Sequence, residues 1–223
     1  MDSLRQELAA DRTRALEMPV VSRETPETLA LLDALVDLLL ESSERQNLIS
    51  RSTRGSIWTR HVADSLQLLA LAPNARIWID LGSGAGFPGL VIACALHVRA
   101  GARVHLVEST GKKASFLREA ANHLGVPAIV HNVRIEDFVK NFKETADVVT
   151  ARALAPLDRL LVLAEPLLKK PVLGLFPKGQ DVDAELTQAS KYWNIDMELV
   201  PSKTSPQGRI VVIKDLRRRP QKK

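Results

Sequence analysis

Residues 79–89, IDLGSGAGFPG, decide the fold of this chain. They join the end of an apolar segment to one carboxylate, Asp80, and then to four glycines within the eight positions 82–89. A glycine-rich turn directly after a buried strand lets the backbone approach a ligand more closely than side chains would allow. Nucleotides, dinucleotides and S-adenosylmethionine all bind at such turns, so the turn alone does not choose among them.

The segments around and after the turn alternate between strand-like and helix-like patterns. Strands are expected at 76–80, 103–108, 128–133, 147–152, 172–178, 197–202 and 209–216. Helices are expected at 88–100, 112–125 and 157–169. This order, with a closing hairpin, predicts an α/β fold with a doubly wound, mostly parallel, seven-stranded Rossmann-like sheet. Ligands in such sheets bind at the carboxyl ends of the strands, near the topological switch point.

The N-terminal third of the chain shows helical patterns and no expected strand. The helical segments are 1–18, 25–42 and 57–72. Thr25 is expected as the N-cap of the second segment, with Pro26 at its first helical position, and Pro73 ends the third. The chain is therefore expected to divide into three parts: a helical extension at 1–73, a sheet domain at 74–216 and a disordered basic tail at 217–223.

The composition is that of an ordinary globular protein. Of the 223 residues, 45% are apolar and 26% are charged, which allows one sizeable α/β core. No segment approaches the roughly eighteen apolar residues of a membrane span, and the charged N-terminus is unlike a signal peptide. A single cysteine, Cys94, excludes an internal disulfide framework and a cysteine-based zinc site. We therefore expect a cytoplasmic protein with no membrane partner.

The net charge of +5 is located in the C-terminal tail. The last seven residues, RRRPQKK, hold five of the 31 Lys and Arg residues and no acid. Without them the chain has 26 basic and 26 acidic residues. A basic arm can bind the phosphate backbone of a nucleic acid by counterion release, or it can be a solubilising end.

The spacing of the glycines favours some ligands over others. The dinucleotide fingerprint G-x-G-x-x-G fails from Gly82, because Phe87 occupies its last position. The same pattern fits from Gly84, but it then starts beyond the strand end and places Pro88 where the helix must begin. The P-loop pattern GxxxxGK(S/T) is absent. An acid at the strand end followed by G-S-G-A-G suits a ligand whose adenosyl and amino-acid parts cross the turn without a pyrophosphate.

Glu108 stands at the tip of the second expected strand. A carboxylate there can accept hydrogen bonds from two ribose hydroxyls. NAD and S-adenosylmethionine share this feature, so Glu108 predicts a ribose and not one particular cofactor. The alternative interpretation is an exposed strand end.

Seven motifs, in order along the chain, carry a family resemblance. They are NLIS (47–50), RHVADSL (60–66), IDLGSGAGFPG (79–89), LVESTGKKASFL (106–117), VRIEDF (133–138), DVVTARALAPL (147–157) and PKGQ (177–180). Together they resemble the S-adenosylmethionine-dependent methyltransferases, and more narrowly the small-subunit ribosomal RNA methyltransferase G family, also called glucose-inhibited division protein B. The resemblance covers roughly residues 45–215.

The resemblance implies S-adenosylmethionine as the cofactor and a set of residues that bind it. These are Asp80, Gly82, Ser83, Gly84, Gly86, Phe87, Glu108, Ile135, Glu136 and Arg152. It implies that Gly82, Gly84 and Phe87 lie along the methionine part and that Glu108 holds the ribose, where relatives more often have Asp.

The resemblance also implies the position of the adenine, the reaction and the partner. Ile135 and Glu136, in a loop after the third strand, are expected to flank the adenine, and Arg152 is expected to line the methyl-transfer pocket. The family transfers a methyl group to N7 of a guanine in the 530 loop of 16S rRNA. The expected partner is therefore small-subunit rRNA or a partly assembled small subunit.

The residues favour guanine N7 as the acceptor by elimination. Methylation of an exocyclic amine commonly needs an (N/D)PP(Y/F) turn after the fourth strand, where this chain has TARALAP. Methylation of pyrimidine C5 needs a nucleophilic cysteine, and Cys94 lies within an apolar helical segment. Guanine N7 has a free lone pair and needs no general base, so proximity and orientation are sufficient for catalysis.

Several cations are candidates for positioning or for RNA contacts. We expect no acid–base catalyst, and Arg152 and Lys178 are the positioning candidates. Arg152 is expected to hold a phosphate, the guanine O6 edge or the cofactor carboxylate; the alternative is an ion pair with Asp147 or Glu136. The expected substrate-binding residues are Arg60, His61, Lys112, Lys113 and Lys178. Among the tryptophans, Trp58 is the one candidate for base stacking, and no spacing predicts a metal site.

Three other functions are compatible with parts of the sequence. One is a methyltransferase for a small molecule or a protein, which would bind the cofactor well and RNA weakly. Another is an NAD-dependent oxidoreductase, which shares the ribose-binding acid. A third is a non-catalytic RNA-binding module that uses the basic tail. A monomer is expected.

Overall fold

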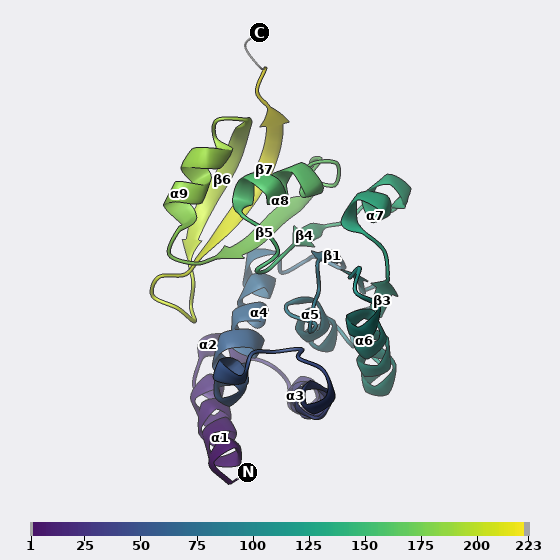
Figure 1. Ribbon diagram of the computed structural model, residues 1–223, viewed down its shortest axis with the longest axis vertical. Helices are drawn as coiled ribbons and strands as arrows, with labels where there is room; N and C mark the ends of the chain where they lie inside the picture. Colours follow the sequence, from purple (N-terminus) through teal and green to yellow (C-terminus); the bar gives the residue numbers. More distant parts are fainter. Residues whose placement is uncertain (1, 221–223) are drawn as a thin grey trace.

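The computed structural model describes residues 2–220. Its centre is a seven-stranded sheet with the strand order β3-β2-β1-β4-β5-β7-β6 (Figure 1). The strands are β1 (Ile77–Leu81), β2 (Arg103–Val107), β3 (Ala128–His131), β4 (Val148–Thr150), β5 (Leu173–Lys178), β6 (Trp193–Pro201) and β7 (Arg209–Arg218). β1 to β5 are parallel, and β7 runs antiparallel between β5 and β6. The predicted doubly wound, mostly parallel sheet is confirmed.

Helices cover both faces of the sheet (Figure 1). They are α5 (Gly89–Ala95) and α6 (Gly111–Leu124) on one face, and α7 (Ile135–Asn141), α8 (Leu157–Ala164) and α9 (Val182–Ala189) on the other. Successive residues of β1 point to opposite faces. Trp78 therefore belongs to the first core, whereas Ile79 and Leu81 belong to the second. Burial on both faces explains why the central strands are nearly continuous apolar runs.

The described part of the chain begins with the helices α1 (Asp2–Leu16), α2 (Pro19–Ser22) and α3 (Pro26–Arg45). α3 begins as predicted, because the Thr25 hydroxyl accepts a hydrogen bond from the Thr28 N–H at 3.2 Å and Pro26 stands at the first helical position. The buried side of α3, with Leu32 and Leu39 fully enclosed, packs against α5 and α6. The helical extension therefore shares a core with the sheet.

Residues 51–71 are helical but do not form the single long helix expected over 57–72. They form a 3₁₀ turn η1 (Arg51–Ser56), a π-helical turn η2 (Trp58–Ala63), a short helix α4 (Asp64–Leu66) and a 3₁₀ turn η3 (Gln67–Leu71). The buried carboxylate of Asp11 accepts hydrogen bonds from the Trp58 and Thr59 N–H groups at 2.8 and 3.2 Å. This contact from α1 holds the start of the π-helical turn. The single long helix was predicted because the spacing of apolar residues does not distinguish a π-helical turn from an α-helix.

Other helix boundaries differ from the expected ones for local reasons. α6 ends as predicted before Gly125, which adopts a φ of +62°. α8 ends at Ala164, earlier than expected, because Pro166 cannot continue a helix. α7 and α9 were not predicted, since each is short and its apolar residues are few. Among residues 2–220, no helix is long and apolar enough to cross a membrane.

The C-terminal hairpin is longer than expected and takes up part of the predicted tail. β7 extends to Arg218, so the expectation of disorder from residue 217 is wrong for its first residues. Arg218 pairs with Glu165 at 3.4 Å, and its guanidinium lies 5.0 Å from the centre of the Trp193 ring. Strand pairing and these contacts hold the start of the tail; residues 221–223 lie outside the described part of the chain.

Candidate functional site

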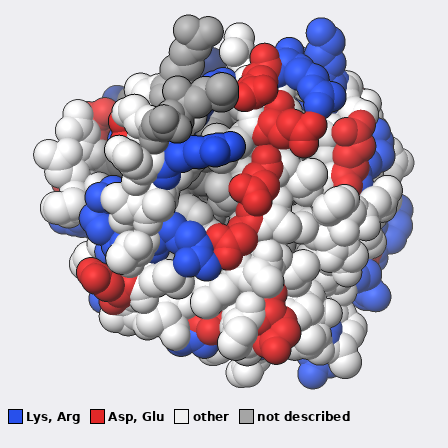
Figure 2. Space-filling view, turned by 90° about the horizontal axis from the view of Figure 1, so that it is seen from below, with Lys and Arg blue, Asp and Glu red and all other residues white. Residues whose placement is uncertain are grey.

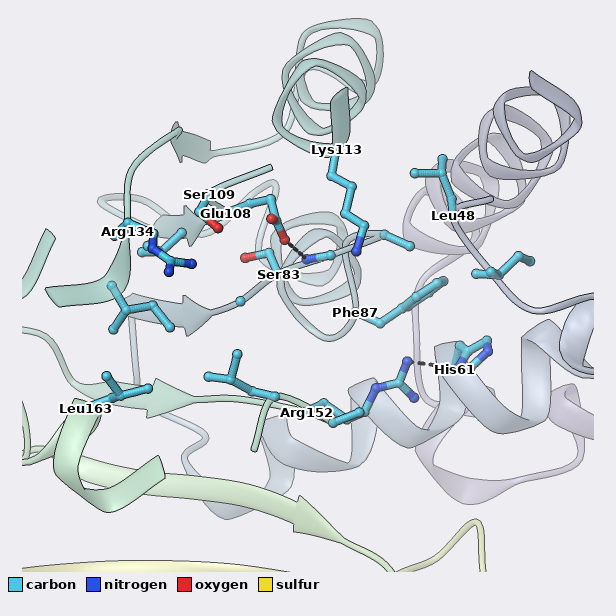
Figure 3. A pocket seen from close by; sticks show the side chains of 18 of the residues that line it. Leu48, His61, Ser83, Phe87, Glu108, Ser109, Lys113, Arg134, Arg152 and Leu163 are labelled. Carbon is cyan, nitrogen blue, oxygen red and sulfur yellow. Dashed lines mark hydrogen bonds between the residues drawn. The ribbon is translucent and has the colours of Figure 1, made fainter. Parts of the chain in front are cut away.

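A cavity of about 600 Å³ opens at the carboxyl ends of β1, β2 and β4 (Figure 3). It lies where the strand order reverses between β1 and β4, the usual ligand position in such sheets. Its lining comes from residues 48–50, 53, 61, 82–85, 87, 107–109, 113, 134–136, 152–154 and 163. The predicted glycine turn and the predicted strand-end acid therefore meet at one cavity.

The glycine turn brings backbone to the surface of this cavity. Gly82 and Gly84 have φ values of +71° and +56°, a region that residues with side chains rarely adopt. A Cβ atom at Gly82 would lie 2.6 Å from Cδ1 of Leu154, another lining residue. A side chain at position 82 would thus strain the turn and press on the cavity wall.

Asp80 lies beneath the turn, fully buried and outside the cavity lining. Its carboxylate accepts a hydrogen bond from the Gly89 N–H at 3.1 Å, and its backbone carbonyl accepts one from the Ser83 hydroxyl at 3.0 Å. Burial raises the pKa of Asp80 to about 7. Asp80 therefore shapes the turn from below. Gly86 also lies outside the lining, whereas Ser83 is part of it.

Glu108 follows β2 and lines the cavity with its carboxylate. The two carboxylate oxygens accept hydrogen bonds from the N–H groups of Gly84 at 3.0 Å and Thr110 at 2.7 Å. Each oxygen has two lone pairs, so each can accept a further hydrogen bond from a ligand. Only 7% of the residue is exposed, which argues against the alternative of an exposed strand end. Two adjacent acceptors suit the neighbouring hydroxyls of a ribose.

Residues 134–136 form another part of the lining. Ile135 and Glu136 are expected in a loop, but they open the helix α7, with Arg134 at the N-cap position. Phe138, which is buried in the sheet core, anchors this helix. Arg134 was missed as a site residue, and Figure 3 shows it on the same side of the cavity as Ser109.

Arg152, just after β4, is held by three groups from η2 and α4. Its guanidinium donates to His61 Nδ1 at 2.8 Å and to the Arg60 carbonyl at 3.0 Å, and it pairs with Asp64 at 3.4 Å. A guanidinium can only donate, so His61 Nδ1 is the acceptor and the ring is neutral. Burial, assisted by the charge of Arg152, lowers the pKa of His61 to about 3.

Phe87 completes this side of the cavity. Its ring stacks on His61 with the ring centres 4.9 Å apart, and the Arg152 guanidinium lies 5.4 Å from the centre of the Phe87 ring. The alternative ion pair of Arg152 with Asp147 or Glu136 is wrong. Asp147 instead accepts backbone hydrogen bonds at the start of β1. Arg152 is thus fixed by the N-terminal part of the chain.

Comparisons with known proteins agree with this geometry. The family model described as rRNA small subunit methyltransferase G matches residues 28–211. The chain is 54% identical, over 215 residues and 96% of both chains, to "Ribosomal RNA small subunit methyltransferase G" of Bradyrhizobium sp. (strain ORS 278). It is 54% identical to the protein of that name from Nitrobacter hamburgensis, over 95% of this chain and 80% of the relative. This chain belongs to the rRNA small subunit methyltransferase G family. The resemblance seen in the sequence motifs is confirmed.

Solved structures share the fold of this family member at low sequence identity. A mutant of MtNAS in complex with S-adenosylmethionine aligns with a TM-score of 0.54 and 17% identity, over 84% of this chain and 76% of that chain. Cofactor-bound Rv0187 from MTB aligns with a TM-score of 0.57 and 13% identity, over 83% of this chain and 89% of that chain. At these identities the likeness shows only that the fold is shared, namely the mostly parallel sheet with helices on both faces.

A second cavity, of about 800 Å³, adjoins the first in this member of the family. Residues 61 and 152–154 line both cavities. The rest of its lining comes from η2, α4 and η3, from residues 155–156 before α8, from the end of β5, from α9, from the loop between β6 and β7, and from the start of β7. That loop is tied to the N-terminal part, because Asp64 accepts a hydrogen bond from the Thr204 hydroxyl at 2.6 Å and Gln67 Oε1 accepts one from the Lys203 N–H at 2.8 Å.

The predicted substrate-binding residues are divided between the two cavities. Lys113 lines the first cavity (Figure 3), Arg60 and Lys178 line the second, and His61 lines both. Lys112 is exposed and lines neither. Lys178 was expected to be available for a phosphate, but it is paired with Glu185 at 2.7 Å.

Other sequence candidates lie away from both cavities. Trp58, Trp78 and Trp193 are at most 3% exposed, so the stacking role considered for Trp58 is wrong and all three are packing residues. Cys94 is fully buried in α5, and burial raises the pKa of its thiol to about 12, which makes it a poor nucleophile. Within residues 2–220, no group of three or more His, Cys, Asp or Glu residues is arranged to hold a metal ion.

Two further parts of the lining were not assigned to the site from the sequence. Leu48, Ile49 and Ser50 belong to the NLIS motif. Two apolar residues directly after the polar end of α3 are the one local sequence feature that could have indicated a role in the site. Ala153 has a φ of +52°, unusual for a residue other than glycine. No sequence pattern predicts that conformation at an alanine.

Proposed function

We propose that this chain is an S-adenosylmethionine-dependent methyltransferase that modifies N7 of a guanine in the 530 loop of 16S rRNA. The observation that carries the proposal is the meeting of the Gly82–Gly84 turn with the Glu108 carboxylate at one cavity, in a member of the rRNA small subunit methyltransferase G family. The activity belongs to the family, and the geometry of this chain is compatible with it.

The residues of the first cavity fit S-adenosylmethionine. Glu108 offers two carboxylate oxygens to the ribose hydroxyls, and the backbone at Gly82 and Gly84 leaves room for the methionine part. Ile135 supplies an apolar wall for the adenine, with Glu136 beside it. When bound, S-adenosylmethionine supplies an electrophilic methyl group on a sulfonium. These assignments support the proposal over NAD, whose pyrophosphate would require the glycine spacing that this turn lacks.

The chain's own contribution to the reaction is orientation and exclusion of water. Guanine N7 needs no general base, and neither cavity has to supply one. Leu48, Ile49 and Leu154 cover the first cavity with apolar side chains. Arg152 is fixed by Asp64 and His61 at the junction of the cavities, where its pairing with Asp64 moderates the positive charge near a base that itself becomes positive.

RNA contacts are expected at the cavity mouths. Figure 2 shows the molecule from below, where a row of Asp and Glu side chains crosses the face and Lys and Arg side chains lie both beside this row and near the edge. A face of mixed charge attracts phosphates weakly. Arg60 beside the second cavity and Lys113 in the first are better placed to meet RNA phosphates.

The working unit and the location of the protein are also proposals. We propose that the working unit is a monomer. The extension at 1–73 and the domain at 74–216 share one core, so we expect them to unfold together although they differ in sequence pattern. A ribosomal RNA substrate supports action in the cytoplasm.

A labelling experiment tests the proposal. The protein is incubated with methyl-labelled S-adenosylmethionine and unmethylated small-subunit rRNA, either free or in particles. Label is expected in RNA that then cleaves at one guanine under chemistry specific for N7-methylguanine. RNA already methylated at that guanine is the control. Cofactor binding without label in any RNA would contradict the RNA substrate and favour a small-molecule or protein acceptor.

A further inference from the structure

The second cavity has the size and position of a binding site for one nucleotide. Its volume of about 800 Å³ lies within the roughly 300–1,000 Å³ that is typical of small-molecule sites. It meets the first cavity at Arg152 and Ala153, which line both. Among the residues that the structure describes, Ala153 is the one non-glycine with a positive φ, +52°. Residues with a strained backbone of this kind are found preferentially at functional sites.

Two arginines line this cavity without an acidic partner. Arg60 is exposed, and neither Arg60 nor Arg209 forms an ion pair within residues 2–220. The Arg209 guanidinium donates to the carbonyls of Pro206 and Gly208 at 3.0 and 2.8 Å through one nitrogen, which leaves its other N–H groups available. A planar guanidinium matches the geometry of a phosphate. These two residues are therefore suited to the phosphates on either side of an inserted nucleotide.

Lys178 and Glu185 place a donor next to an acceptor inside the cavity. Their side chains are 10% and 25% exposed, and Lys178 Nζ donates to Glu185 Oε2 at 2.7 Å and to the Ala155 carbonyl at 2.8 Å. An ammonium has three N–H groups, so one remains. Glu185 Oε2 also accepts from the Leu157 N–H at 2.6 Å, whereas Oε1 accepts no hydrogen bond from residues 2–220. The pair thus presents one free donor and one free acceptor.

We propose that Lys178 and Glu185 recognise the Watson–Crick edge of the acceptor guanine in this second cavity. Lys178 Nζ donates to O6, and Glu185 Oε1 accepts from the N1 and N2 hydrogens. The inference rests on the proposed function and names the residues that select the base. Adenine presents the opposite order, an amino group where guanine has O6 and a lone pair at N1, and would meet a like group at each position. N7 lies on the far side of O6 from N1, so this mode of binding leaves N7 free to react.

Analogues at the acceptor position test the proposal. RNA fragments with guanosine or inosine at that position are compared by kcat/KM for methyl transfer; inosine keeps O6, N1–H and N7 but lacks the N2 amine. The wild-type protein is expected to prefer guanosine by about tenfold, the discrimination typical of one good base contact. In Glu185→Gln, the amide oxygen takes over the hydrogen bonds from Lys178 and from the Leu157 N–H. The amide NH₂ group then faces the base and cannot accept the N2 hydrogen. The preference for guanosine over inosine is therefore expected to disappear.

A matched variant and a folding check complete the experiment. Glu198→Gln changes an exposed carboxylate of β6 that pairs with Lys214 and lines neither cavity, and it is expected to keep the wild-type preference. Thermal unfolding and cofactor affinity show whether each variant is folded. If Glu185→Gln does not fold, the wild-type comparison decides, because equal rates for guanosine and inosine overturn the proposal.

The outcomes separate this inference from the proposed function. Guanine N7 methylation with an unchanged preference for guanosine in folded Glu185→Gln overturns the base-recognition role of the pair and leaves the proposed function intact. Absence of transfer to any RNA by the wild-type protein overturns both. Loss of the preference in Glu185→Gln alone, with Glu198→Gln unchanged, supports the assignment.

Discussion

The two cavities that meet at Arg152 are built in different ways. The centre of the first is formed by the glycine turn and Glu108, which directly follow β1 and β2, and side chains from other segments complete its lining. The second is lined by charged side chains from distant parts of the chain, and two of its cations are already paired: Arg152 with Asp64, and Lys178 with Glu185. Backbone recognition suits a ligand of fixed shape. Paired charges orient a base without leaving a net positive charge beside it.

The largest expected effect comes from a side chain in the turn of the first cavity. In Gly82→Ala, the left-handed φ of +71° costs about 1–3 kcal/mol, and the new Cβ presses on Leu154. Cofactor affinity, measured by calorimetry, is expected to fall about a hundredfold or more, because the upper end of this strain alone corresponds to about a hundredfold at 1.4 kcal/mol per tenfold and the contact with Leu154 adds to it. Gly101→Ala is the control, since φ is +75° there but nothing lies within 4 Å; it should be destabilised and still bind. Equal cofactor affinity in both variants would show that the cavity does not depend on this turn.

The next effect is expected at the junction of the two cavities. Arg152→Ala removes the group that links His61 and Asp64 to the end of β4, so orientation at the junction is lost. We expect kcat to fall about a hundredfold, with cofactor affinity little changed. Arg152→Lys is expected to restore little, because a lysine lacks the guanidinium fork. Arg159→Ala, on the exposed side of α8, is the matched control. Undiminished turnover in Arg152→Ala would remove Arg152 from the mechanism.

A smaller effect is expected from the acid of the first cavity. Glu108→Gln keeps the size of the side chain but loses one of the two acceptors now used by the Gly84 and Thr110 N–H groups. The cost of about 1–3 kcal/mol for an unsatisfied group predicts a decrease in cofactor affinity of about tenfold or more. Glu119→Gln, exposed on α6, provides the comparison. If both variants bind the cofactor as tightly as the wild type, the ribose assignment of Glu108 is wrong.

The last effect is on stability and not on binding or turnover, and it concerns the support beneath the turn. The pKa of Asp80 is raised by burial to about 7 from its ordinary value of 3.8, so the folded protein holds more protons than the unfolded chain between these pH values. The free energy of unfolding should therefore fall as pH rises through this window, by at most about 1.4 kcal/mol per pH unit, and level off above pH 7. Urea unfolding from pH 5 to 8 measures it. Asp80→Asn cannot titrate and is expected to reduce the slope; identical slopes would contradict this role.

Much of the first cavity was predictable, because its parts are local. The turn at 82–86 and the acid at Glu108 each follow a strand that the apolar pattern identifies, and parallel strands bring their carboxyl ends to one edge. The helix at 135–141 was missed, since one turn or two of helix leaves too few apolar positions to show a period. Arg134 was missed with it.

The second cavity was not predictable to the same degree, because its contacts join residues far apart in sequence. The pairing of Lys178 with Glu185 depends on where α9 packs, and that of Arg152 with Asp64 depends on the docking of η2 and α4 against the sheet. Arg152 and Lys178 are recognisable from the sequence as candidate cations, but the partners expected for Arg152 differ from those observed, and Lys178 is paired where it was expected to be available.

The amino-acid sequence by itself determined the mostly parallel, doubly wound sheet, the glycine turn, the acid at the tip of β2 and the family. These depend on hydrophobic periodicity and on motifs within a few residues, which the chain encodes locally. The tertiary structure decided the π-helical turn held by Asp11, the left-handed Ala153 and the ion pairs of the second cavity. Each of these requires burial and contacts that arise only when separate segments pack together, so no local pattern contains them.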